Sequence, residues 1–407
     1  MPLPSALKSR RHIHTSDIRQ AAKLAVEAIH GATRIAESVH QAVWATLGAN
    51  NDLAPTITRG LTGFVYRNIH RVTALVGNTI DGALKQLAPV FAKMDDDSIS
   101  SNEREAILAA LNGVMGDRLA VTQNLLATPM TIHANNLALE LTNLLTNSLP
   151  SNIKIATPKT SLILFIHGLC MNDLQWHSVT HQVDYETPLA QTLNATPLYL
   201  RYNTGLSIAQ NGRALSQALE ALVTHWPVKI ASLTIIAHSM GGLVTRSACY
   251  AAEGENSTWH GKLKNIVFLG TPHHGAPLER AGHLLDMILA SNKYSRAFTK
   301  LTMLRSQGIN DLRHGNLTDD RRQIPLPSNV NCYAIAATTA TSRSPIADKL
   351  IGDGLVPLDS ALGKHNNKLR DLNFNKNFTR MLTRTNHMGL LGNRVVLSQM
   401  TTWLKLG

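Results

Sequence analysis

The thirteen residues from Ser232 to Val244, S-L-T-I-I-A-H-S-M-G-G-L-V, constrain the fold of this 407-residue chain more than any other stretch. The run Thr234 to Ile236 is β-branched and apolar on both sides, which is typical of a strand buried on both faces of a parallel sheet. Two small residues, Ala237 and Gly241, stand two positions before and after Ser239. A sharp turn from strand to helix has room only for small side chains there. The pattern therefore predicts a strand, a tight turn that presents Ser239, and a helix.

This turn has the nucleophile-elbow pattern, with alanine in place of the usual first glycine. A serine presented in this way needs hydrogen-bond donors for the negative charge that develops on a substrate oxygen. The first candidate donor is the backbone N–H of Met240, at the start of the following helix. The second is the N–H of Leu169, because His167-Gly168-Leu169 follows an apolar run that reads as a strand. We expect His167 itself to be a structural histidine. The alternative is that Ser239 is an ordinary serine at a glycine-rich helix start.

From residue 159 onward, short apolar runs alternate with segments that have helical spacing. Strands are expected at 161–166, 197–200, 234–236, 265–269 and 332–336, and helices at 189–193 and 208–225. This alternation predicts an α/β fold, a mostly parallel sheet with helices on both faces, over residues 151–407. Residues 275–327 interrupt the pattern, and we expect them to form a cap over the site.

Residues 1–150 lack strand signals and are expected to form an all-α N-terminal region. Helices are expected within 17–47, within 57–90, from a Ser100–Glu103 capping box onward, and over Leu137 to Leu145. Through Met94 this region carries eleven Lys and Arg against five Asp and Glu. Apolar stripes beside such an excess suit docking on an anionic membrane surface, although the same stripes could simply pack in a core.

The whole chain has 39 Lys and Arg against 27 Asp and Glu, a net charge of +12. This balance favours anionic partners, but there is no basic block and no interleaving of aromatic and basic residues, so we expect no nucleic acid partner. Cys170, Cys249 and Cys332 are odd in number and far apart, which predicts buried free thiols rather than a disulfide framework. The start of the chain lacks the apolar segment of a secretory signal, and no run approaches 18 apolar residues. A cytoplasmic protein, with peripheral membrane association left open, is expected.

A serine nucleophile needs a histidine base and a carboxylate that orients it, and in this fold the acid and then the histidine follow the serine along the chain. The candidate acids are Asp348, Asp353 and Asp359, and the candidate bases are His365 and His387. Asp353 is favoured because it stands between two glycines after the strand at 332–336. His387 is favoured because it directly precedes a final helix, whereas His365 lies in a polar run. His273 and His274 precede every candidate acid and are expected to shape the mouth of the site.

Five motifs occur in one order, H-G-L at 167–169, A-H-S-M-G-G at 237–242, L-G-T-P-H-H-G at 269–275, D-G-L-V-P-L-D-S-A-L-G at 353–363 and N-H-M-G-L-L at 386–391. With these motifs, residues 159–407 resemble a bacterial lipase/esterase of the α/β-hydrolase superfamily, and they are also similar to its inositol-deacylase type. The resemblance implies that Ser239 is the nucleophile, Asp353 the acid and His387 the base.

Secreted lipases with the D-G-x-V pattern place a calcium-binding aspartate two residues after the histidine, and Gly389 stands at that position here. A structural calcium is therefore not expected, and the triad chemistry needs no metal or organic cofactor. The expected function is hydrolysis of carboxylic esters of lipid-like or other apolar acids. The alternatives are an acyltransferase or thioesterase with the same triad, and a membrane- or granule-binding adaptor with a vestigial hydrolase fold.

Overall fold

The computed structural model describes residues 102–139, 157–177, 182–255, 257–276, 306–341 and 352–406. The described residues fall into two compact units, and the second of them contains Glu105–Ala120 and all described residues from Ala127 onward. The helices expected within 17–47 and 57–90, and the capping residue Ser100, lie outside the described residues. The third expected helix is present as α3, Asn102–Val121, which is kinked at Met115.

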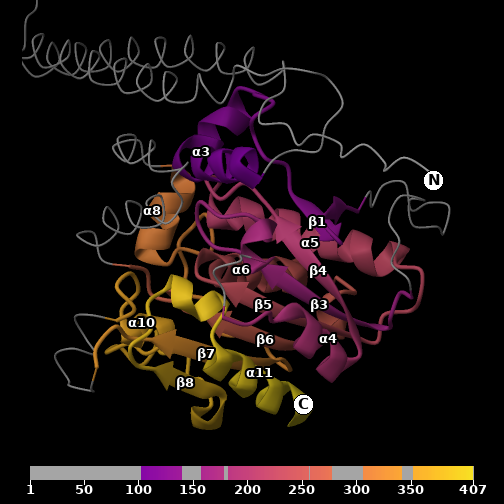
Figure 1. Cartoon of the computed structure of the whole chain (residues 1–407). Coiled ribbons are helices and arrows are strands. Elements are labelled where there is room, and N and C mark those ends of the chain that lie inside the picture. Colours follow the sequence, from indigo (N-terminus) through magenta and orange to yellow (C-terminus); the bar gives the residue numbers. More distant parts are fainter. Residues whose placement is uncertain are drawn as a thin grey trace, which may run out of the picture. The chain divides into compact units, whose positions relative to one another are not determined.

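An eight-stranded sheet runs through the second unit (Figure 1), with the strand order β2-β1-β4-β3-β5-β6-β7-β8. Its strands are β1 Thr131–Ala134, β2 Leu137–Ala138, β3 Ser161–Ile166, β4 Ala195–Arg201, β5 Ser232–His238, β6 Leu263–Leu269, β7 Asn331–Ala337 and β8 Thr379–Leu382. Strand β1 is antiparallel to β2 and to β4, and all other neighbouring strands are parallel. The carboxyl ends of β3, β5, β6, β7 and β8 therefore lie at one edge of the sheet, where ligands bind in open α/β sheets.

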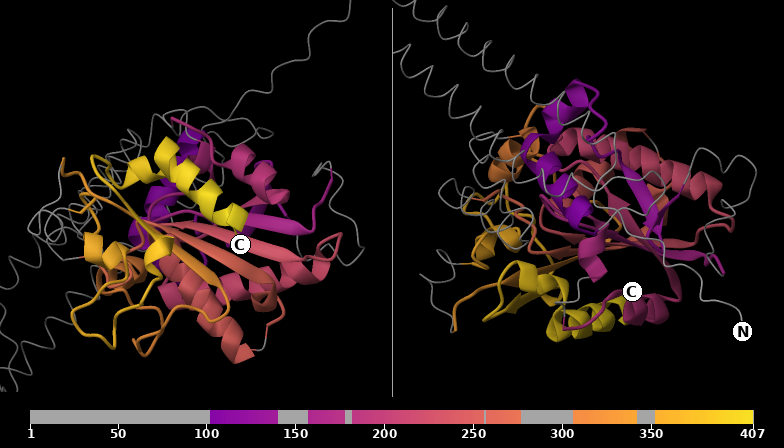
Figure 2. Two further views of the ribbon diagram at one scale, coloured as in Figure 1. Left: turned by 90° about the horizontal axis from the view of Figure 1, so that it is seen from below. Right: turned by 45° about the horizontal axis from the view of Figure 1, so that its top comes forward.

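The central strands are apolar on both faces because helices cover both (Figure 2). The helices are α4 Glu186–Leu193, α5 Ile208–His225, α6 Met240–Glu255, α8 Gln307–His314, α10 Leu358–Ala361 and α11 Arg394–Leu406, with 3-10 turns η2 Asp173–His177, η3 His260–Lys262, η5 Lys376–Phe378 and η6 Met388–Leu391. On one face, Ile163 and Phe165 of β3 share a buried core with residues of α4 and α11. On the other face, Ile166 packs against Gly241 of α6, and α6 packs against α5.

The α/β-hydrolase fold predicted from the sequence is confirmed. Each of the five predicted strands lies within a strand of the sheet, and both predicted helices are present, with α5 spanning the same residues, 208–225, as expected. Its start is fixed by Ser207, whose side chain accepts the backbone N–H of Gln210 in a capping box.

The expectation that the first 150 residues lack strands is wrong. Strand β1 pairs with β4, through partners such as Ile132 and Leu200, and Leu137 begins β2 rather than a helix. The physical reason is tertiary pairing, since a short segment that adds to a sheet edge gains backbone hydrogen bonds that local periodicity does not reveal. The sheet thus includes residues that precede the predicted domain start at 151.

The predicted cap over 275–327 is only partly described. Its second half contains α8, which begins after the side chain of Ser306 accepts the N–H of Ile309. Residues 277–305 lie outside the described residues. Among the described helices, none combines the length and the apolar character that crossing a bilayer requires.

Candidate active site

Ser239 stands where β5 turns into α6, as the sequence predicts. Its φ of 54° is in the left-handed region, which is strained for a residue with a side chain and marks a sharp turn. Its N–H donates to the carbonyl of Leu269, at the end of β6, over 2.8 Å. Gly241 is required here, because an added Cβ would lie 2.6 Å from the carbonyl oxygen of His167. The turn therefore brings Ser239 to the carboxyl edge of the sheet.

Asp353 and His387 form a buried pair at the same edge. His387 Nδ1 lies 2.6 Å from Asp353 Oδ2. The other carboxylate oxygen, Oδ1, accepts the N–H groups of Leu355 and Val356 over 2.9 and 2.8 Å. The backbone N–H of His387 also donates to the carbonyl of Asp353 over 3.1 Å. With one oxygen held by two backbone donors, the carboxylate can present only the other oxygen to the imidazole, which fixes the ring with Nε2 as the free nitrogen.

The ends of β5 and β6 bring the histidine ring and the serine together. Ser239 binds the carbonyl of Leu269, and the next residue, Gly270, has a φ of 59° and lies directly under the imidazole of His387. A Cβ at Gly270 would lie 3.1 Å from His387 Nδ1 and 3.2 Å from Cε1. On the other side, the ring of His238 lies 4.6 Å from that of His387, and its Nε2 is 3.2 Å from the His387 carbonyl.

Ser239, Asp353 and His387 are 2%, 1% and 1% exposed. Among the described residues, His387 Nε2 has no hydrogen-bond partner, so Ser239 Oγ does not bond it in this structure. Catalytic hydrogen bonds are often long or unformed before substrate binds. A histidine that accepts a proton from a serine needs such an unbonded Nε2.

The two predicted oxyanion donors flank the serine. Met240 is the first residue of α6, so its N–H has no acceptor within the helix. Gly168 packs against the serine, since a Cβ there would lie 2.9 Å from Ser239 Cβ, and Leu169 follows it in the chain with its side chain fully buried. Within the described part of the chain, the N–H groups of Leu169 and Met240 have no acceptor. An N–H without an acceptor is what the predicted binding of an oxygen next to Ser239 would require.

His167 has the structural role expected for it. Its Nδ1 lies 2.9 Å from the carbonyl of Gly168, and its ring stacks on Tyr202, whose hydroxyl donates to the His167 carbonyl over 2.9 Å. Burial lowers the pKa of His167 to about 4, so the ring is neutral at physiological pH. Because the His167 ring is neutral, it places no positive charge at the end of β3, next to the loop that carries Leu169.

The rival residues occupy other environments. Asp359 lies in the first turn of α10, His365 lies in the following loop with its ring 5.0 Å from that of His274, and Asp348 is outside the described residues. The expectation that His273 shapes the mouth of the site is wrong. Its ring is buried between Phe268 and Phe374, with Nδ1 3.4 Å from Arg246, and burial lowers its pKa well below the ordinary value.

The cysteines are free and buried, as expected. Burial raises the pKa of the Cys332 thiol to about 12 and raises that of Cys170 and Cys249 as well, so none of the three is a reactive thiolate.

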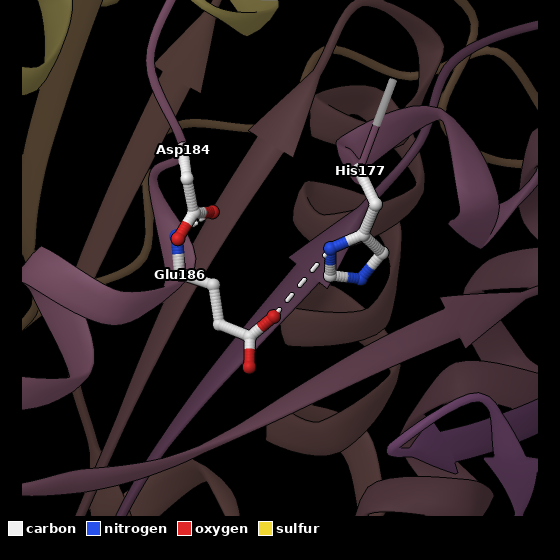
Figure 3. Close-up of side chains that lie close together, drawn as sticks. All are labelled: His177, Asp184 and Glu186. Atoms are coloured by element: carbon white, nitrogen blue, oxygen red, sulfur yellow. Dashed lines mark hydrogen bonds and ion pairs between the residues drawn. The ribbon is translucent and has the colours of Figure 1, made fainter. Parts of the chain in front are cut away.

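His177, Asp184 and Glu186 are the one group within the described residues whose ligand atoms could approach a common metal ion, all within 4.8 Å of one another (Figure 3). Local hydrogen bonds account for this arrangement. Asp184 accepts the N–H groups of Glu186 and Thr187 at the start of α4, and Glu186 accepts the hydroxyl of Tyr199 over 2.6 Å and lies 3.5 Å from His177 Nδ1. Asp184 therefore binds the start of α4, Glu186 binds Tyr199 and His177, and the cluster gives no reason to assign a metal. Gly389, the position of the family's calcium ligand, offers no side-chain oxygen.

Sequence reasoning missed Gly270, although it stands within the L-G-T-P-H-H-G motif. A glycine directly after a predicted strand was the available signal, because a backbone that packs under a side-chain ring leaves no room for a side chain of its own. It also missed the contribution of α3, which is described below.

Parts of the chain are similar to known proteins. Residues 158–341 match the family described as the PGAP1-like alpha/beta domain. Similar solved structures include the mature lipase BlEst2 of Bacillus licheniformis, with 14% identity, a TM-score of 0.40 and coverage of 63% of this chain and 96% of that one. They also include an esterase of Pyrobaculum calidifontis, with 12% identity, a TM-score of 0.39 and coverage of 61% and 77%. No curated protein sequence matches the chain.

The sheet order, the serine turn after β5 and the family match over 158–341 point to the same superfamily. The predicted resemblance is therefore confirmed: this chain carries a domain similar to the PGAP1-like alpha/beta domain, with the α/β-hydrolase fold.

Proposed function

We propose that this protein is a serine hydrolase that cleaves carboxylic esters of lipid-like or other apolar acids. The observation that carries the proposal is the 2.6 Å contact between His387 and Asp353, at the sheet edge where a strained turn presents Ser239. A buried, oriented imidazole near a serine on a sharp turn is the arrangement that activates a hydroxyl for attack on a carbonyl.

The reaction follows from these positions. Ser239 Oγ attacks the ester carbonyl carbon while His387 Nε2 accepts its proton, and the N–H groups of Leu169 and Met240 hold the resulting oxyanion. Collapse breaks the bond to the alcohol, which leaves with the proton from His387, and the acyl group remains on Ser239. Water, deprotonated by the same nitrogen, then releases the acid and restores the serine. No step requires a metal or an organic cofactor.

The apolar side chains that border the site support an apolar acyl group. Met171 Sδ lies beside Gly168, and Leu390 packs against Gly270. Both glycines adjoin the proposed reacting atoms, so an acyl chain attached to the ester carbonyl would lie close to these buried apolar side chains.

The test is hydrolysis of a series of p-nitrophenyl esters, from acetate to palmitate, by wild type and by Ser239→Ala. We expect turnover that favours medium or long chains and falls by about 10⁴-fold or more in the variant. Turnover by Ser239→Ala within about tenfold of wild type would exclude the serine mechanism. Product analysis with an added alcohol acceptor separates a hydrolase, which releases free acid, from an acyltransferase.

We also propose that the protein acts from the cytoplasm on esters at an anionic membrane surface. The three free thiols suit a reducing compartment. The excess of six positive charges through Met94, eleven minus five, supports attraction to anionic lipid.

A further inference from the structure

Helix α3 lies directly on the loop that carries Leu169. This oxyanion loop, residues 168–173, touches α3 at Gly113, where a Cβ would lie 2.1 Å from Cys170 Sγ and 3.0 Å from Cys170 Cα. The thiol also lies 3.9 Å from the carbonyl of Ala110 on the same helix. Helix and loop therefore meet with no side chain of α3 between them, and a shift of either one moves the other.

Cys170, the residue in this contact, directly follows Leu169 and helps to fix its position. Cys170 has a φ of 57°, a left-handed conformation that tertiary contacts have to enforce in a residue with a side chain. Its N–H donates to Thr204 Oγ1 over 3.1 Å. On the other side, Gly168 packs against Ser239 Cβ. Leu169 is thus held between Ser239 and the contact of Cys170 with α3.

The loop after β4, which supplies Thr204, is itself fixed by α3. Asn203 Nδ2 donates to the carbonyl of Gly116 over 2.9 Å. A Cβ at Gly205 would lie 2.2 Å from the carbonyl oxygen of Asn112. The helix therefore supports both the oxyanion loop and the threonine that anchors it.

Two partly buried ion pairs hold the far end of the oxyanion loop. Arg201, at the end of β4, donates from Nε to Asp173 Oδ1 over 2.5 Å and from Nη1 to Glu105 Oε2 of α3 over 2.7 Å. The side chains of Asp173, Glu105 and Arg201 are 2%, 12% and 19% exposed, so solvent screens these pairs less than it screens pairs on the open surface. Helix α3 thus contacts the loop directly at Cys170 and is connected through Arg201 to Asp173.

We propose that α3, which lies in the N-terminal part of the chain outside the matched family domain, is a positioning element that holds the Leu169 N–H at the oxyanion. The inference rests on the proposed function. Gly113 and Glu105 touch no reacting atom and act through Cys170 and Arg201.

Gly113→Ala tests the first contact, because its methyl group cannot fit unless Cys170 moves. We expect kcat per active serine, titrated with a fluorophosphonate, to fall about 10- to 100-fold with KM nearly unchanged, since displacement of an oxyanion donor affects the transition state more than the ground state. Cys170→Gly removes the sulfur 2.1 Å away and the Cβ, leaves only the Cα at 3.0 Å, and suits the left-handed φ. Gly113→Ala combined with Cys170→Gly should therefore recover most of the lost kcat, to within about threefold of Cys170→Gly alone. Gly254→Ala is the matched control, because a Cβ there meets nothing within 4 Å.

Glu105→Gln tests the second contact and keeps the inference refutable if Gly113→Ala fails to fold. We expect kcat per active serine to fall about threefold or more. Asp319→Asn, which removes an exposed pair with Arg213, should leave kcat unchanged. The inference would be overturned if Gly113→Ala kept the wild-type kcat, if it changed only KM, or if adding Cys170→Gly restored none of the lost kcat. If wild type neither hydrolyses esters nor reacts with the fluorophosphonate, the proposed function fails instead.

Discussion

Replacing Asp353 with asparagine isolates the role of the carboxylate without changing the shape of the site. The amide oxygen can still accept the N–H groups of Leu355 and Val356, which now bind Oδ1. The amide nitrogen then takes the place of Oδ2, 2.6 Å from His387 Nδ1. Because that nitrogen is a donor, Nδ1 has to become the acceptor, and the ring proton moves to Nε2.

An imidazole with its proton on Nε2 cannot accept a proton from Ser239. We therefore expect kcat to fall by about 10⁴-fold at pH 7, which corresponds to about 5.5 kcal/mol of transition-state stabilisation. The assay is p-nitrophenyl ester hydrolysis at saturating substrate, with the unfolding temperature as a check that the fold survives. The matched control is Asp359→Asn, six residues away on α10, which should stay near wild type. A more severe loss in Asp359→Asn than in Asp353→Asn would refute the assignment of the acid.

Three further predictions concern stability, metals and lipid. Burial lowers the pKa of His167 to about 4, below its ordinary value of about 6.5, so the unfolded chain binds the extra proton first and stability is lost as pH falls from about 6.5 toward 4. Denaturant titrations should show that this residue lowers the free energy of unfolding by about 2 kcal/mol between pH 7 and 4.5. The variant His167→Asn should show a smaller decrease, and an unchanged decrease in that variant would contradict the assignment. Ester hydrolysis should survive exhaustive EDTA treatment, because Gly389 supplies no calcium ligand, and a loss restored specifically by calcium would count against this. Full-length protein should co-sediment with anionic vesicles at low salt and dissociate from them as salt rises. Deletion of residues 1–94 should abolish this binding but not short-ester hydrolysis. Insoluble or inactive protein after the deletion would instead favour a core role for that region.

The sequence predicts the strands of the central sheet well because strands buried on both faces are continuous apolar runs, as in β3 and β5. It predicts the turn at Ser239 because small residues are required two positions away on each side. The short edge strands β1 and β2 escape prediction, since four and two residues are too few to show a period, and the leucines at 137, 141, 144 and 145 have helical spacing.

The support of the site by α3 could not be predicted for a different reason. Glycines at 113 and 116 signal close approach of some other segment, but nothing in the local sequence says which one. The partners Cys170 and Asn203 are distant in the chain, and only the folded arrangement brings them to α3. Likewise, the burial of His273 depends on Phe374, a residue about a hundred positions later.

The most direct test of the central claim is labelling of the wild-type protein with a fluorophosphonate, followed by mass spectrometry of the intact protein and of its peptides. The account predicts one label per chain, on Ser239, formed in step with the loss of ester hydrolysis and absent in Ser239→Ala. A label on another residue that accompanies inactivation, or complete inactivation with Ser239 unmodified, would contradict it.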